Sequence, residues 1–129
     1  MPLVRIDVQT GRTPAELRRI ADVVQDVMLE AFAAPPRDRY QIITEHPVGH
    51  IIAEDTGLGF DRSDGVTVVQ IFQQGRSVEQ KKAAYAQLAA RLNKECGVRP
   101  QDLIVTVNAN ERPDWSFGMG RAQFLEGDL

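Results

Sequence analysis

The sequence contains a single cysteine, Cys96, so no disulfide can form within the chain. Only 6% of the residues are aromatic, and no apolar run approaches the roughly 20 residues that a membrane-spanning helix needs. A formal net charge of −3 gives no indication of a basic surface for nucleic acid or anionic lipid. The first residues lack the basic segment and apolar run of a secretory signal. We therefore expect a cytoplasmic protein with no nucleic-acid or membrane partner.

Motifs that would announce a cofactor or a common catalytic group are also missing. The sequence has no glycine-rich phosphate loop, no paired cysteines with metal-binding spacing and no Ser/His/Asp signature in a supporting context. His46 and His50 are close to Glu54, but a proline and a glycine between the histidines oppose a helix that would present both to a metal. We expect loop histidines, no metal and no organic cofactor, and a packing role for Cys96.

The chain does contain an internal repeat. The 129 residues fit one domain, and sliding the sequence over itself by 64 positions aligns several identical residues without a gap. The aligned pairs are Val4 with Val68, Gln9 with Gln73, Gly11-Arg12 with Gly75-Arg76, Pro36 with Pro100, and Asp38 with Asp102. The repeat predicts two copies of one structural unit, in halves of about 2–47 and 66–111, followed by a tail over 112–129.

In the first half, residues 3–8 alternate apolar and polar side chains, which is typical of a half-buried strand. Thr13 and Glu16 then form a capping box with proline between them, and residues 17–32 follow the helical period. Two prolines end this helix, and residues 39–44 read as a second strand.

The second half predicts the same order of elements. Residues 66–72 are strongly β-forming, Ser77 begins a second capping box, and the apolar helix face runs to Cys96. Gly97 stands at the helix C-cap, and residues 103–107 form the matching strand. In the linker, residues 46–65, His50–Ala53 suggest a short extra strand; residues 115–129 look neither helical nor like a plain strand.

These elements predict an α+β, two-layer fold built from a tandem β-α-β repeat. The four-stranded sheet is expected to be mostly parallel within each unit, with right-handed crossovers and both helices on one face. The other face then needs cover, which favours an oligomer.

Pro2 is the first candidate for chemistry. Removal of Met1 would leave it as a secondary amine, and an α-amine with a pKa near 8 can act as base, acid or nucleophile. A Met-Pro start is also common without any function. Architecture favours the functional interpretation, since a strand begins directly after Pro2.

Two charged side chains are further candidates. Arg76 follows a glycine at a strand-to-helix junction, where an arginine suits a carboxylate ligand, although Arg12 holds the same place in the first half and a solvated arginine would fit as well. Asp38, just before a strand, can orient water or simply make a turn. Trp115, Phe117 and Phe124 concentrate in the tail, where they line a pocket or fill a subunit interface.

Several stretches resemble the tautomerase superfamily, and within it the malonate semialdehyde decarboxylase family. They are Asp38-Arg39-Tyr40-Gln41, Glu54-Asp55-Thr56-Gly57-Leu58-Gly59, Arg76-Ser77 with Glu79-Gln80-Lys81, Asp114-Trp115-Ser116-Phe117-Gly118, and the tail from Arg121 to Leu129. The resemblance runs the full length of the chain, and its most specific part is the Asp-Trp-Ser-Phe-Gly segment.

The resemblance implies a homotrimer of the tautomerase fold that decarboxylates 3-oxopropanoate without a cofactor. Pro2 would be the catalytic amine and Arg76 the carboxylate-binding arginine, while Asp38 would be tied to the amine and to water activation. The pocket wall would consist of Trp115, Phe117, Phe124 and Leu129. Stripping water from a carboxylate by such a wall favours loss of carbon dioxide.

One substrate-binding position departs from the family pattern, because Gln74 stands where that family has a second arginine. This loss of charge leaves two alternatives open on the same site: keto–enol tautomerisation of a small 2-keto acid, or hydration of an unsaturated acid. A trimeric binding protein without catalytic activity is a third.

Overall fold

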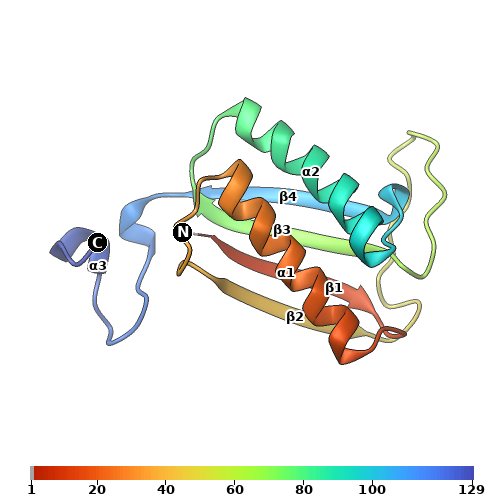
Figure 1. Cartoon of the computed structure of the whole chain (residues 1–129), viewed down its shortest axis with the longest axis horizontal. Coiled ribbons are helices and arrows are strands. Elements are labelled where there is room, and N and C mark those ends of the chain that lie inside the picture. The colour runs from red at the N-terminus through yellow and green to blue at the C-terminus, as the bar shows by residue number, and fades with distance from the viewer. Residues whose placement is uncertain (1) are drawn as a thin grey trace.

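The computed structural model describes residues 2–129 and consists of two layers, a sheet and a pair of helices (Figure 1). The strands are β1 (Leu3–Gln9), β2 (Tyr40–His46), β3 (Thr67–Gln74) and β4 (Leu103–Asn110). The helices are α1 (Pro14–Ala31) and α2 (Val78–Cys96), with a single helical turn, α3 (Gln123–Glu126), in the tail. Short 3₁₀ turns cover Pro100–Asp102 and Arg112–Asp114.

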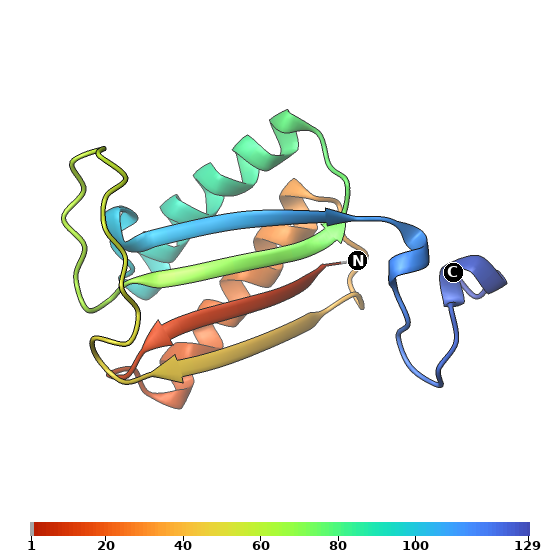
Figure 2. The ribbon, with the colours of Figure 1, turned by 180° about the vertical axis from the view of Figure 1, so that it is seen from behind.

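The sheet has the order β2-β1-β3-β4. β1 pairs with β2 and β3 pairs with β4 in parallel, whereas the central pair β1/β3 is antiparallel. Both long helices cover one face of the sheet (Figures 1 and 2). The α+β, two-layer, tandem β-α-β prediction is confirmed.

Local sequence explains where both helices begin. Thr13 and Ser77 each accept a hydrogen bond from a backbone N–H three residues on, and Glu16 and Gln80 accept one in return, which satisfies amides that a helix start leaves free. Gly97 ends α2 at φ +69°, a left-handed conformation that costs glycine little.

The core lies between helices and sheet. Apolar side chains of β1 and β3 alternate into it, and two register pairs place apolar residues opposite each other, Val4 with Ile71 and Ile6 with Val69. From the helices come Val24, Met28 and Leu88, among others, all fully buried. Burying a side chain of this size contributes about 1.5–3 kcal/mol, so each of these residues stabilises the packing of the helices on the sheet.

The observed elements follow the 64-residue repeat, with one correction. Buried Val24 and Met28 of α1 correspond to buried Leu88 and Leu92 of α2. In the central strands, however, the gapless offset is wrong: Val4 faces the helices, whereas Val68 pairs with Asp7 on the opposite face. Side chains alternate between the two faces along a strand. An offset that aligns the helices but is one residue out in the strands therefore assigns the strand residues to the wrong face of the sheet.

Two local expectations are also corrected. Residues 47–66 form no strand, so the extra strand at His50–Ala53 was wrong: Ile52 is exposed, and Gly49 and Ile51 donate their amides to the Gln9 side chain rather than to a sheet. The tail does contain helix, since α3 forms one turn that Gly127 ends at φ +83°. A single turn is too short to show a helical period in sequence.

The face of the sheet away from the helices has no covering layer among residues 2–129 (Figure 2). It carries apolar side chains such as Ile42, which is 43% exposed, beside polar ones such as Arg5. His46 Nε2 and Asp7 Oδ1 lie 2.7 Å apart on this face. Neither of the two long helices, nor α3, is apolar and long enough to span a membrane within the described residues.

Candidate functional site

Pro2 is buried at the start of β1, between the start of β2 and the end of β3. Leu3 is in register with Tyr40 on one side and with Phe72 on the other. Continuing that register by one residue sets Pro2 level with Arg39 and Gln73. The position therefore brings together three segments that are far apart in sequence. Met1, whose removal the amine requires, lies outside the described residues.

Arg76 lies in the loop between β3 and α2, next to that end of the sheet, and its guanidinium is held by backbone carbonyls. Nε donates to Phe32 O at 3.1 Å, and Nη1 donates to Gln74 O and Gly75 O at 3.1 and 3.2 Å. Among residues 2–129 no acceptor engages Nη2. These hydrogen bonds fix the orientation of the half-buried side chain. The Nη2 edge of the guanidinium stays available to an anion.

Asp38 is half-buried in the turn before β2, and its Oδ2 is shielded from solvent with no hydrogen-bond partner in the part of the chain described. The neighbouring Arg39 points elsewhere: Nη2 lies 2.7 Å from Asp22 Oδ1 on α1, and Nε donates to Gln41. The hydrogen bond from Arg39 lowers the pKa of Asp22. Arg39 thus anchors the turn to α1 and is not paired with Asp38.

Gln74, the last residue of β3, is half-buried on the face away from the helices. The residue before it, Gln73, turns to the helix side and is completely buried. Neither Gln73 Nε2 nor Gln73 Oε1 has a hydrogen-bond partner within residues 2–129. The sequence did not single out Gln73, because a glutamine near a strand end is ordinary and only the register shows what lies opposite.

Two other tail aromatics and Tyr40 of β2 gather around Phe117. Its ring stacks on Trp115 at 5.3 Å and meets Phe124 edge to face at 5.4 Å between ring centroids. It also stacks on Tyr40 at 5.6 Å, which joins the tail to the first residue of β2. We call Tyr40, Trp115, Phe117 and Phe124 the aromatic cluster. Leu129, expected in the same wall, is 61% exposed and forms none of these ring contacts.

Tyr40 is the site residue that sequence reasoning missed. It stands inside the Asp38–Gln41 stretch that carries the family resemblance, but its contact with a residue 77 positions later depends on how the tail folds back. Polar contacts fix that course: Trp115 Nε1 donates to Asn110 Oδ1 at 2.7 Å, and Phe117 N donates to Gln123 Oε1 at 3.0 Å.

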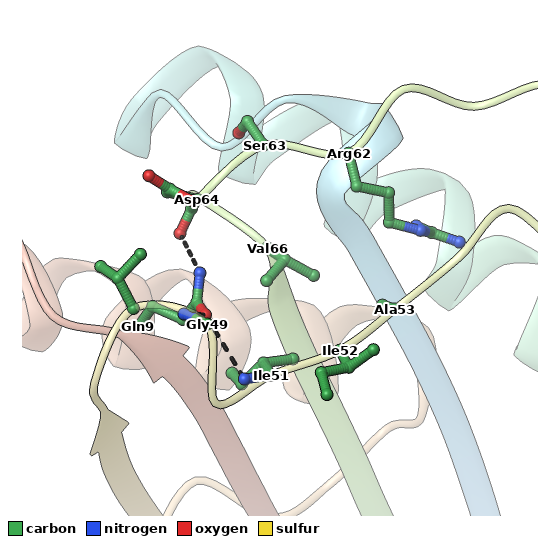
Figure 3. Close-up of a pocket in the computed structure, with 10 residues that line it drawn as sticks. Gln9, Gly49, Ile51, Ile52, Ala53, Arg62, Ser63, Asp64 and Val66 are labelled. Carbon is green, nitrogen blue, oxygen red and sulfur yellow. Dashed lines mark hydrogen bonds between the residues drawn. The ribbon is translucent and has the colours of Figure 1, made fainter.

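A cavity of about 340 Å³ lies at the opposite end of the sheet, beside the linker (Figure 3). Its polar centre is Gln9, whose amide donates to Asp64 O at 3.0 Å and accepts from Gly49 N at 2.7 Å. Gln9 is thus fully engaged in holding the linker. None of the predicted site residues lines this cavity.

No group of three His, Cys, Asp or Glu side chains among residues 2–129 is arranged to hold a metal. Burial raises the pKa of the Cys96 thiol, which opposes thiolate formation. The Pro2 end combines a buried Pro2, one anchored arginine, one unpaired carboxylate oxygen and an aromatic wall. Such a set can bind a small carboxylate and move a proton next to it.

Known proteins similar to this chain belong to one family of enzymes. Two models of the tautomerase enzyme family match residues 38–118 and 2–61. The chain is 48% identical over 129 residues to the probable tautomerase YrdN of Bacillus subtilis (strain 168), covering 100% of both chains. Among solved structures, a malonate semialdehyde decarboxylase described as having decarboxylase and hydratase activities is 42% identical, with TM-score 0.94 and 98% of each chain covered.

FG41 malonate semialdehyde decarboxylase inhibited by 3-bromopropiolate is 43% identical, with TM-score 0.94, over 98% of this chain and 97% of that one. Similarity at this level over the full length, together with a family model that matches more than half of the residues, establishes kinship and not fold alone. The chain belongs to the tautomerase superfamily of enzymes.

Proposed function

We propose that this enzyme decarboxylates malonate semialdehyde (3-oxopropanoate) or a related small 3-oxo acid, without a cofactor, by means of the Pro2 amine. The observation that carries the proposal is the convergence of Pro2, Asp38 and Arg76 at one end of the sheet beside the aromatic cluster. The 42% identity to a malonate semialdehyde decarboxylase over 98% of both chains supports the same reaction.

Arg76 would bind the substrate carboxylate. Its Nε and Nη1 are held by three backbone carbonyls, so the planar group is preorganised and Nη2 is presented to the ligand. The aromatic cluster would remove water from the carboxylate, which raises the energy of the charged ground state relative to neutral carbon dioxide.

Pro2, after removal of Met1, would be a charged secondary amine that donates a hydrogen bond to the carbonyl oxygen of the substrate. When the bond between the carboxylate carbon and C2 breaks, its electron pair forms the enolate of acetaldehyde, and the ammonium stabilises the oxygen that gains charge. Protonation of C2 then gives acetaldehyde. Asp38 Oδ2, unpaired and shielded, is suited to accept from the ammonium or to orient water.

A second reaction is favoured by Gln74. An uncharged amide in place of a second arginine binds a carboxylate less strongly, whereas tautomerisation of a 2-keto acid or hydration of an unsaturated acid needs only the amine and one anion anchor. If the missing charge limits decarboxylation, Gln74→Arg should raise its rate, and a panel of phenylpyruvate and unsaturated three-carbon acids separates these reactions. Binding without turnover of any of them would leave a non-catalytic carboxylate-binding protein.

We also propose a homotrimer. The sheet face away from the helices carries exposed Ile42 beside half-buried Leu3, Phe72 and Ile104, and a second copy would remove this apolar surface from water. Three sheets facing inward would cover every copy equally. Light scattering of the purified protein checks this, and a monomer at micromolar concentration would contradict it.

The catalytic proposal is tested by release of carbon dioxide from 3-oxopropanoate. Intact mass first establishes whether Met1 has been removed, because a retained Met1 makes the Pro2 nitrogen an amide without a lone pair to offer. Pro2→Ala and Arg76→Ala should each lower kcat/KM by at least tenfold. Arg12→Ala is the matched control, since Arg12 occupies the corresponding turn at the opposite end and donates to Gly65 O. Undiminished turnover by Pro2→Ala would refute the mechanism.

A further inference from the structure

Gln73 stands out among the buried polar side chains. It is 0% exposed, and its amide nitrogen and its amide oxygen both lack partners within residues 2–129. Buried amides are nearly always hydrogen-bonded, because an unpaired one loses its water without compensation. A leucine at this buried position would have no polar atom to satisfy, so an amide here indicates a polar group that it serves.

The register identifies that group. Phe72 lies opposite Leu3, so Gln73 lies opposite Pro2 on the same, helix-facing side of the sheet. Opposed residues of an antiparallel pair have Cα atoms roughly 4.5–5.5 Å apart, which is within reach of a glutamine side chain. Asp38 Oδ2, in the turn before β2, is likewise shielded and unpaired. The group that the Gln73 amide can serve is therefore the Pro2 amine.

Proton count makes the match specific. A protonated N-terminal proline has two N–H groups, and in the proposed reaction one of them donates to the substrate carbonyl. The second N–H then needs an acceptor within the protein, and Gln73, level with Pro2 when the β1/β3 register is continued, has an unpaired Oε1.

We propose that Gln73 is a positioning residue whose Oε1 accepts a hydrogen bond from one N–H of the Pro2 ammonium, which orients the amine and leaves its second N–H for the substrate carbonyl. The inference rests on the proposed function only in requiring a free Pro2 amine. Charged neighbours of the amine are Asp38 from the turn before β2 and Arg76 from the β3–α2 loop; Arg39 is engaged by Asp22 on α1. Asp38 favours the ammonium, Arg76 opposes it, and Gln73 adds an acceptor that favours it.

The test is a ¹⁵N NMR titration of the Pro2 nitrogen in proline-labelled protein, with Met1 removal verified by intact mass. Gln73→Leu should lower the pKa of Pro2 by about one unit, the size expected for loss of one hydrogen bond to a charged group. Gln73→Met, which conserves volume, should give the same shift if the leucine variant folds poorly. Gln25→Leu is the matched control, because Gln25 on α1 is also buried with an unpaired Nε2, and it should leave the pKa of Pro2 unchanged.

An unchanged Pro2 pKa in folded Gln73→Leu and Gln73→Met would overturn the inference, as would an equal shift in Gln25→Leu. The titration needs no substrate, so a shift without decarboxylase activity supports the role of Gln73 while the proposed reaction fails. Decarboxylase activity without a shift in the pKa of Pro2 supports the proposed reaction and contradicts the role of Gln73. A retained Met1 overturns both, since Pro2 would then have no N–H to donate.

Discussion

The aromatic cluster should hold the tail to the sheet independently of the core, and Phe117→Ala tests this. The Phe117 ring makes all three ring contacts of the cluster, at 5.3–5.6 Å. Each such pair contributes about 0.5–1.5 kcal/mol, so the substitution should cost the docked tail about 1.5–4.5 kcal/mol. At about 1.4 kcal/mol per tenfold change, opening of the tail should become about tenfold to a thousandfold more frequent.

Hydrogen exchange measures that opening at individual amides. Leu125 N and Asp128 N donate to Ala122 O and Gln123 O at 2.9 and 3.1 Å, so both amides report on the folded tail. Their protection should fall in Phe117→Ala, whereas amides of β1 and β3 should keep theirs. Among the described residues, none after Val107 belongs to the core, so Tm should stay nearly unchanged.

A matched control removes the same side chain elsewhere. Phe60 lies in the linker, 44% exposed, and its ring is close only to the Arg62 guanidinium among the contacts described. Phe60→Ala should leave tail exchange unaltered. Two results would refute the reasoning: unchanged protection at Leu125 in Phe117→Ala, or a fall in Tm of several degrees, which would make the tail part of the core.

Other predictions concern stability. Leu88→Ala, at a site that is 0% exposed, should destabilise the fold by about 2–5 kcal/mol in urea denaturation, and a smaller loss would mean that the helix interface collapses into the gap. Asp102→Ala should cost about 1–3 kcal/mol in the same assay, because the buried carboxylate accepts from Ser63 N at 2.7 Å and Ser63 would be left unpaired. The pKa of Glu95 is lowered chiefly by its hydrogen bond from Arg91; this contribution is therefore present above the unfolded pKa of about 4.3 and lost as pH falls through the lower folded value. Tm of Glu95→Gln should accordingly fall less between pH 5 and 3 than that of the unaltered chain, as calorimetry will show.

Residue patterns by themselves determined the order and type of the main elements. Strand alternation, the capping boxes at Thr13 and Ser77, and Gly97 are local signals, and local signals survive in any tertiary context that does not oppose them. They also indicated that Pro2 begins a strand and that Arg76 follows one. The resemblance quoted from the tail and from Asp38–Gln41 indicated the family that the comparisons then established.

Only the tertiary structure decided which residues meet. The antiparallel β1/β3 register sets Gln73 level with Pro2, and a one-residue slip in the repeat, invisible to a gapless alignment, decides that Val68 faces away from the core. Tyr40 reaches Phe117 because polar contacts turn the tail back toward β2. Such contacts join segments whose separation in sequence carries no periodic signal, so no pattern along the chain could specify them. Pro2 therefore became a candidate through its sequence position, but Gln73, the acceptor that we propose for its amine, is set level with it only in the folded sheet.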